Sequence, residues 1–262
     1  MMQLTPIVKN ILLLNVVVFI AMQIAVRQSN MAFLYTDYFS LHKPPGSIAR
    51  TTVEVDGVDF FVPGGTKLTD GTELSRRNVQ TIVDGSESLQ SEFREAENLR
   101  ADKFKPVQII SHFFSHSLND LFHIIFNMFV LASFGPILEM VMGKKRFLAF
   151  YLFCGVVGGI LIALLDPSIW PVVGASGAIF GVMVAFAMYF PREKLNIMFI
   201  PIGFEARKLV PALGIISLVF VVLDFLGIEA GGSISHFGHL AGMIAAVLFF
   251  YVEKFLPFNL QD

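Results

Sequence analysis

Four polar residues inside apolar stretches of this sequence have side chains suited to catalysis: Ser176, His239, His123 and Asn127. A serine hydroxyl is a weak nucleophile until a neighbouring base takes its proton, and a neutral imidazole is the usual base. Ser176 together with His239 would meet that need. The residue types therefore predict acyl transfer, with Ser176 as the nucleophile and His239 as its base.

Attack on a carbonyl creates an oxyanion, which preformed hydrogen-bond donors must stabilise. The amide of Asn127, an imidazole N–H of His123 and the backbone N–H of Ser176 at the start of a helix are suitable donors. His123 and Asn127 are four residues apart, so both lie on one face of a helix. We therefore predict that these two side chains stabilise the oxyanion.

The elements that must position these residues are membrane helices. Of the 262 residues, 55% are hydrophobic and only 15% are charged. Together with a mean hydropathy of +0.68, this exceeds what a soluble domain can bury in one core. A helix needs about 20 mostly apolar residues to cross a bilayer. Six runs approach this length, which predicts an all-α polytopic membrane protein with six transmembrane helices: residues 11–26, 121–142, 147–165, 172–190, 209–228 and 237–252.

The short loops between these runs differ sharply in charge. The loops after the third and fifth runs, around Asp166 and Glu229, contain no Lys or Arg. By the positive-inside rule, the basic loops after the second and fourth runs face the cytoplasm. This predicts a protein of the cell (plasma or inner) membrane with both ends of this chain cytoplasmic. The basic residues are Lys144, Lys145, Arg146, Arg192, Lys194, Arg207 and Lys208.

This orientation brings the four polar residues to one depth. The second, fourth and sixth runs all enter the membrane from outside, and each carries its candidate residues in its first half. At 1.5 Å per residue, all four lie within a few helical turns of the outer face. Any one of them alone would favour a helix-packing serine or a structural histidine. Their coincidence on three helices instead predicts an active site that opens to the outer face.

Residues 43–105 are different in kind. They contain nine Lys or Arg and eleven Asp or Glu, with few long apolar runs, so they must lie in water. We predict a soluble insertion in the first external loop. It separates residues 1–42, with the first transmembrane helix, from residues 106–262, with the five helices of the catalytic part.

Two local elements are expected within this insertion. Asp56-Gly57 is a strong two-residue turn signal between short β-favouring segments, which predicts a hairpin over residues 52–62. Residues 86–102 have the charge-rich composition of a solvated helix.

Three motifs resemble those of the rhomboid family of intramembrane serine proteases, and the resemblance covers residues 7–42 and 104–256. The segment from His123 to Asn127 is similar to the H-x-x-x-N motif of that family's second helix. Residues 174–177 resemble its G-x-S-G nucleophile motif, and residues 239–242 its A-H-x-x-G motif. Gly238 replaces the alanine of the last motif.

The resemblance implies a six-helix rhomboid-like bundle that works as a serine endopeptidase. Such a protein cleaves transmembrane segments of membrane proteins near the outer face with a Ser-His dyad. No cofactor and no metal are implied, and the partners are transmembrane substrates and the lipid bilayer. A phenylalanine stands where the family often has tyrosine, and it can still stack on His239. The supporting residues implied are Gly174, Gly177, Phe180 and Gly242.

Other functions fit parts of the sequence. A catalytically inactive rhomboid-like membrane chaperone or client-binding protein would usually lack the serine or the histidine, and both are present. A transporter or a metalloenzyme could use the six histidines, but the sequence has no H-E-x-x-H motif. A net charge of −2 gives no sign of the excess positive charge that is typical of proteins that bind nucleic acid. The substrate, the oligomeric state, the role of the insertion and the roles of His112, His116 and His236 stay open.

Overall fold

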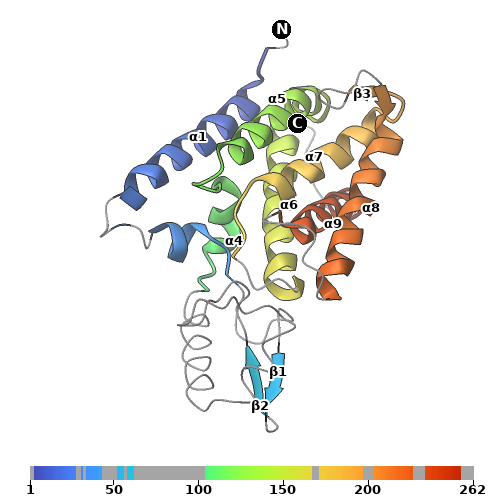
Figure 1. Cartoon of the computed structure of the whole chain (residues 1–262). Helices are drawn as coiled ribbons and strands as arrows, with labels where there is room; N and C mark the ends of the chain where they lie inside the picture. The colour runs from blue at the N-terminus through green and yellow to red at the C-terminus, as the bar shows by residue number, and fades with distance from the viewer. Residues whose placement is uncertain are drawn as a thin grey trace.

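The protein is mostly helical (Figure 1). The structure, a computed structural model, describes residues 3–27, 31, 34–42, 52–55, 58–61, 104–166, 171–196, 203–226 and 234–254. Within these residues, five helices are long and apolar enough to cross a membrane, and a sixth apolar helix, α7 (Ser176–Tyr189), has 14 residues. The five are α1 (Pro6–Arg27), α5 (Leu121–Met142), α6 (Lys144–Leu165), α8 (Ala206–Phe225) and α9 (His236–Glu253).

Five of the six predicted spans are confirmed as long apolar helices, and α5 has the bounds predicted for the second run. Asp120 begins this helix, because its side chain accepts a hydrogen bond from Phe122 N at 2.9 Å. Gly143 ends it with a φ of 81°, a conformation that L side chains rarely adopt.

The fourth predicted span is wrong at its beginning. Residues 172–175, expected to be helical, lie outside α7. Gly174 has a φ of 127°, and its N–H donates to the carbonyl of His112 at 3.0 Å rather than within a helix. At 1.5 Å per residue, 14 residues give about 21 Å, which is less than the roughly 30 Å of a bilayer core.

The expectation of an all-α protein also needs correction, because two small antiparallel hairpins are present. β1 (Thr52–Val55) pairs with β2 (Val58–Phe61) in the register of a two-residue loop, which confirms the hairpin predicted there. β3 (Lys194–Asn196) pairs with β4 (Gly203–Glu205) between α7 and α8, and the sequence reasoning missed it. The turn at residues 56–57 and the expected helix over 86–102 lie outside the described residues.

Three short pieces complete the described helical structure between α1 and α5. They are the π-helix η1 (Tyr35–Phe39), α4 (Gln108–Ser111) and the 3₁₀ helix η2 (His112–Phe114). Their apolar members extend the core toward the start of α7. Phe113, for example, is 1% exposed, and a Cβ added at Gly155 of α6 would lie 2.9 Å from its ring. Only a glycine therefore leaves room for this ring against α6.

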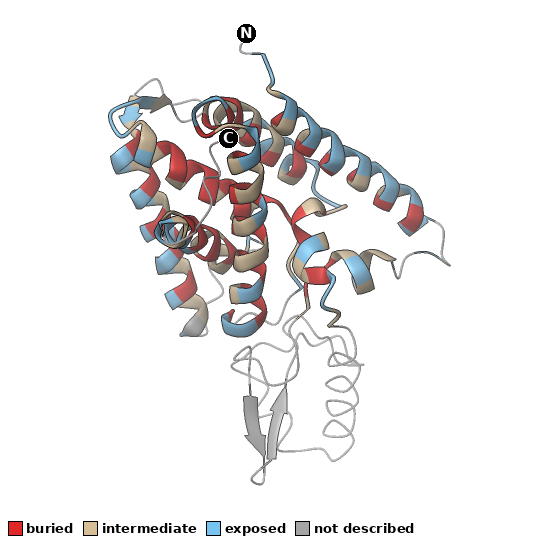
Figure 2. Cartoon of the chain, turned by 180° about the vertical axis from the view of Figure 1, so that it is seen from behind, coloured by how far each residue is buried: buried red, intermediate tan, exposed pale blue. Residues whose placement is uncertain are grey.

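The core of the bundle is formed by α6, α7 and α9, which contact one another extensively. Buried positions line the inner faces of these helices, while many apolar side chains stay exposed on the outer faces of the bundle (Figure 2). Tyr151, Phe147 and Phe150 of α6 are fully buried in this core. A bundle that exposes apolar side chains outward is the expected arrangement when lipid is the solvent.

A buried carboxylate joins α1 to α5. Glu139 is 3% exposed, and its two oxygens accept hydrogen bonds from the backbone N–H groups of Ile7 and Val8 at 3.1 and 2.9 Å. The first N–H groups of a helix lack intrahelical partners and carry partial positive charge, so a carboxylate is a favourable cap. Glu139 thus has a structural role, because it caps the start of α1.

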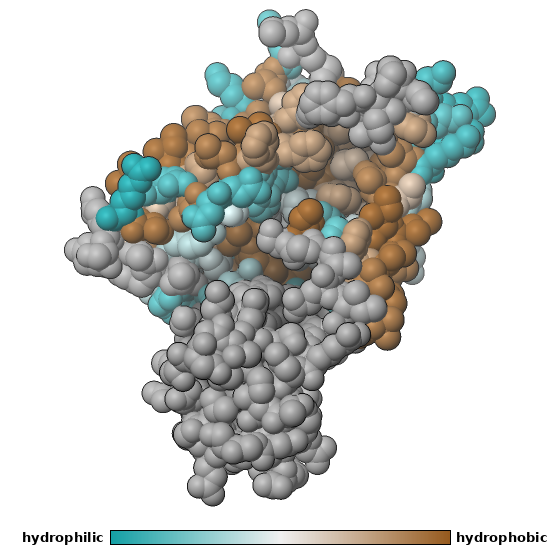
Figure 3. Space-filling model, in the orientation of Figure 1, coloured by the Kyte–Doolittle hydropathy of each residue, from teal (hydrophilic) through white to brown (hydrophobic). Residues whose placement is uncertain are grey.

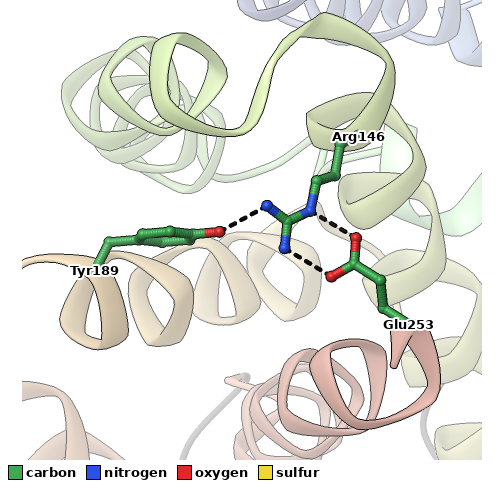
Figure 4. A network of polar contacts seen from close by, with 3 residues as sticks. All are labelled: Arg146, Tyr189 and Glu253. Atoms are coloured by element: carbon green, nitrogen blue, oxygen red, sulfur yellow. Dashed lines mark hydrogen bonds and ion pairs between the residues drawn. The ribbon is translucent and has the colours of Figure 1, made fainter. Parts of the chain in front are cut away.

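A polar network of three residues links the start of α6 to the last residues of α7 and α9 (Figure 4). Arg146 of α6 donates two hydrogen bonds of 2.6 Å to the carboxylate of Glu253 on α9. It donates a third, of 2.9 Å, to the hydroxyl of Tyr189 on α7. Because Ser176 begins α7 and α9 begins at His236, this network lies at the ends of these helices away from both residues.

Candidate active site

Ser176 is the first residue of α7 and is half-buried. The segment that leads to it is held by two distant parts of the chain. Val172 forms an isolated antiparallel bridge with Leu41, with hydrogen bonds of 2.9 and 3.0 Å, and Gly174 donates to the carbonyl of His112. The segment is thus fixed up to the point where the helix begins. The first N–H groups of a helix have no intrahelical acceptor, so that of Ser176 is available to a substrate oxygen.

The imidazole of His123 lies against this segment. A Cβ added at Gly174 would be 2.7 Å from His123 Nε2, so only a glycine lets the ring approach so closely. The backbone N–H of Ser117 donates to Nδ1 of His123 at 3.3 Å. Nδ1 must therefore be the unprotonated acceptor, which leaves the proton of a neutral ring on Nε2. His123 presents an N–H donor beside the backbone that precedes Ser176.

His239 of α9 stacks on Phe180 of α7, with ring centroids 4.0 Å apart and an interplanar angle of 10°. This confirms the predicted stacking. Phe180 follows Ser176 by four residues, so both side chains project from the same face of α7. The imidazole of His239 therefore lies over the face of α7 that carries Ser176, about one helical turn along.

The approach of α9 to α7 is as close as two backbones allow. A Cβ added at Gly242 would lie 1.8 Å from the carbonyl oxygen of Gly177, and one added at Gly177 would lie 3.1 Å from the carbonyl oxygen of Gly238. Gly242, which the family resemblance implied as a supporting residue, thus packs directly against α7. Small residues permit such crossings in membrane bundles, and here they determine how near His239 stands to α7.

Asn127 is buried on α5, and its Nδ2 donates to the carbonyl of His123 at 2.8 Å. One of its two amide hydrogens is therefore used within its own helix. The two residues do share one face of α5, as expected. The role of Asn127 as an oxyanion donor stays a prediction, which depends on its second amide hydrogen.

His116 and His236 occupy positions beside the predicted site residues. His116 is fully buried, and its ring meets that of His123 edge-to-face at 5.2 Å. Burial lowers the pKa of His116 to about 3, because the charged form would lose its hydration. His236 stacks on Phe220 of α8 at 4.3 Å and lies 5.8 Å from His239.

Sequence reasoning missed a buried glutamine that hydrogen-bonds to the segment before residue 43. Gln108 is fully buried. Its Oε1 accepts from the backbone N–H of His42 at 3.1 Å, and its Nε2 donates to the carbonyl of Asp37 at 2.8 Å. It thereby joins α4 to the segment that carries Leu41. The available signal was a glutamine within the apolar stretch that follows Pro106.

A small cavity adjoins Ser176 and has a volume of about 10 Å³. Two further polar residues, His112 and Ser235, take part in its lining. A cavity needs about this volume to hold one water molecule, together with polar partners. Within the described part of the chain, no group of three His, Cys, Asp or Glu side chains is placed to hold a metal ion.

These helices define a polytopic membrane protein with several spans. The chain belongs to the rhomboid family, because the rhomboid domain model matches residues 103–254, more than half of its length. Presenilin-associated rhomboid-like protein A, mitochondrial, of Danio rerio is 31% identical over 152 residues, which are 56% of this chain and 37% of that protein.

Two further relatives are similarly identical to this chain over part of their length. Rhomboid protein 1, mitochondrial, of Saccharomyces cerevisiae is 30% identical over 159 residues, covering 56% of this chain and 42% of the relative. The rhomboid protein YdcA of Bacillus subtilis is 35% identical over 136 residues, covering 50% and 61%. The matched part spans less than two thirds of each of these relatives.

Proposed function

We propose that this protein is an intramembrane serine endopeptidase in which Ser176 and His239 form a catalytic dyad. The observation that carries the proposal is the stacking of His239 on Phe180, one turn beyond Ser176 on the same face of α7. An imidazole held there by a flat aromatic ring can accept the proton of a hydroxyl group on that face. Membership of the rhomboid family supports the same reaction class.

In the proposed reaction, Ser176 Oγ attacks the carbonyl carbon of a peptide bond while His239 takes the hydroxyl proton. The carbonyl oxygen becomes an oxyanion. His239 then gives the proton to the leaving amine, and an acyl-enzyme ester remains on Ser176. Water, deprotonated by His239, attacks this ester and restores the free hydroxyl.

Two of the proposed oxyanion donors lie near the start of α7. The backbone N–H of Ser176 and the Nε2–H of His123 both border Gly174, and Asn127 is the third proposed donor. Each donor of this kind typically contributes about 10² to 10³ in rate. The proposed substrates are transmembrane segments that unwind locally, since a stable helix keeps its carbonyls hydrogen-bonded.

We further propose six membrane crossings, with α7 as a short fourth one, both ends of this chain in the cytoplasm and the site opening outward in a cell membrane. Single-cysteine labelling tests this orientation in a background with Cys154 replaced. Gly231→Cys should react from outside and Lys145→Cys only after the membrane is opened. Labelling of Lys145→Cys from outside would overturn it.

Residues 43–105 are proposed to be a soluble insertion that the chemistry does not need. The family match begins at residue 103, just before the end of this stretch. Replacing residues 44–102 by a short linker should leave cleavage of a generic transmembrane substrate largely intact, because loop closure depends only weakly on length. A shortened protein that folds but cleaves no substrate would make the insertion part of the site.

The direct test of enzymatic function is labelling with a serine-directed fluorophosphonate in liposomes. The wild type should label, whereas Ser176→Ala should not, and only the wild type should cleave a model transmembrane substrate. The alternative, an inactive chaperone or client-binding protein, predicts that the wild type binds the substrate without labelling or cleavage. Labelling that persists in Ser176→Ala would reject Ser176 as the nucleophile.

A further inference from the structure

A groove lies between α7, α8 and α9, at the ends of these helices away from Ser176. Its volume of about 770 Å³ is within the usual range for small-molecule sites. Its lining is apolar except at one end, where Arg207 and Tyr251 stand. The apolar members include Ala187, Met188, Pro211 and Val247.

Arg207 and Tyr251 lie at the same end of the groove because of the way α8 and α9 are aligned. Gly214 of α8 meets the side chain of Met243 on α9, where an added Cβ would be 3.0 Å from it, and Arg207 and Tyr251 line the same groove, so the two helices are antiparallel. Seven residues back along α8 is Arg207, and eight residues on along α9 is Tyr251. The wall from Met243 to Tyr251 is therefore about 12 Å long. Pro211 has no N–H, so the carbonyl of Arg207 also loses its helical donor at this end.

Arg207 is held at the mouth of the groove. Its Nε donates to Glu205 Oε2 at 2.6 Å, and Lys208 Nζ lies 3.7 Å from the other oxygen of this carboxylate. The hydrogen bond from Arg207 lowers the pKa of the Glu205 carboxyl group, so the carboxylate stays ionised and orients the guanidinium. The side chain of Arg207 remains 51% exposed, with further N–H donors for an anion.

The surroundings of this mouth are basic. Residues 192–208 contain four Lys or Arg against two Glu, a net charge of +2. Figure 3 shows hydrophilic side chains gathered at the end where β3 lies in Figure 1 and hydrophobic ones over α8 below it. An apolar channel with a cationic end matches a molecule that has an acyl chain and an anionic head.

We propose that this groove binds one anionic phospholipid, with its phosphate at Arg207 and part of an acyl chain between α8 and α9. The bundle lies in a membrane, so phospholipid is the solvent that the groove faces. Met188 and Val247 are 53% and 58% exposed, which leaves the groove open to an entering chain. A transmembrane helix of a partner would fill the apolar part, but it would not by itself supply the anion that Arg207 favours.

The test uses purified full-length protein and measures lipids retained in native mass spectrometry. The protein is titrated with phosphatidylglycerol or, in parallel, with phosphatidylcholine of the same chains. Arg207→Gln should weaken phosphatidylglycerol binding about five-fold, the effect of one basic residue near a headgroup. Lys208→Gln is the matched control. It removes one positive charge beside the same carboxylate but does not line the groove, so its effect should be clearly smaller than that of Arg207→Gln.

Two further variants test the apolar part of the groove. Ala187→Leu and Val247→Phe enlarge side chains that line it and should reduce phosphatidylglycerol retention while Arg207 is intact. Val247 is exposed, so its variant should fold even if the first does not.

Equal losses in Arg207→Gln and Lys208→Gln would mean general surface attraction and overturn the site. Unchanged binding in Val247→Phe, or equal retention of both lipids by the wild type, would also overturn it. A wild type that retains no lipid but forms dimers that Val247→Phe abolishes would assign the groove to a second copy of the chain.

Discussion

The contact between Gly242 and Gly177 gives the most direct test of how α9 positions His239. In Gly242→Ala, the new methyl group would lie 1.8 Å from the carbonyl oxygen of Gly177, whereas ordinary contacts begin near 3.4 Å. The difference, 3.4 − 1.8 = 1.6 Å, is the distance by which the two backbones must separate. The position of the Cβ is fixed by its own backbone and the atom it meets is a backbone oxygen, so no side-chain rotation can relieve the clash.

The size of the effect follows from this displacement. Overpacking of a core typically costs about 1 to 3 kcal/mol of unfolding free energy, and a misplacement of about 1 Å can cost about 10² in rate. We therefore expect Gly242→Ala to unfold at a lower temperature and to cleave at least about 100-fold more slowly.

Gly158→Ala is the matched control for this experiment. Gly158 is also a buried helical glycine that faces Gly242, but its added Cβ would meet nothing closer than 3.7 Å. This variant should keep the wild-type rate and melt at the same temperature or slightly higher, since alanine favours helix over glycine. The assay is cleavage of a model transmembrane substrate in liposomes, with thermal unfolding in parallel. Wild-type activity and stability in Gly242→Ala would refute the reasoning.

The remaining predictions concern single side chains of the site. Ser176→Ala and His239→Ala should each reduce cleavage to background and the double variant should be no slower, because the two act as one unit; substantial activity in a folded His239→Ala protein would reject the dyad. Asn127→Ala should cost about 10² to 10³ in rate and His123→Ala a similar or smaller factor, with fluorophosphonate labelling retained in both; full activity in both would remove them from the oxyanion site. His116 has a pKa of about 3 when folded and about 6.5 when unfolded, so the unfolded chain binds its proton first and stability falls as the pH drops below about 6.5. Between pH 7 and pH 5 this loss is about 2 kcal/mol, and His116→Phe should melt with a weaker dependence on pH over that interval; an unchanged dependence would contradict the burial argument.

Hydropathy was sufficient to predict the long helices, because each segment that crosses a bilayer must be long and apolar whatever the other segments do. For α5, the apolar run lies between Asp120, which caps its start, and Gly143, whose positive φ ends it, so even its bounds were readable. The family resemblance also indicated that Phe180 could stack on His239, and the two rings do stack.

Hydropathy could not predict where α7 begins. Val172 and Val173 are as apolar as helical residues, but Val172 bonds to Leu41 and the next glycine to His112, both distant in sequence. The burial of Gln108 and the tautomer of His123 depend in the same way on partners from other segments.

The sequence by itself determined that this chain crosses a membrane and which residue types stand at the starts of its helices. These properties depend on composition and local spacing. Only the tertiary structure decided that Ser176 follows a non-helical segment, that His123 lies against Gly174, and that a groove with Arg207 at its mouth lies between α7, α8 and α9. Each of these depends on contacts between segments that are distant in the sequence, which no local pattern specifies.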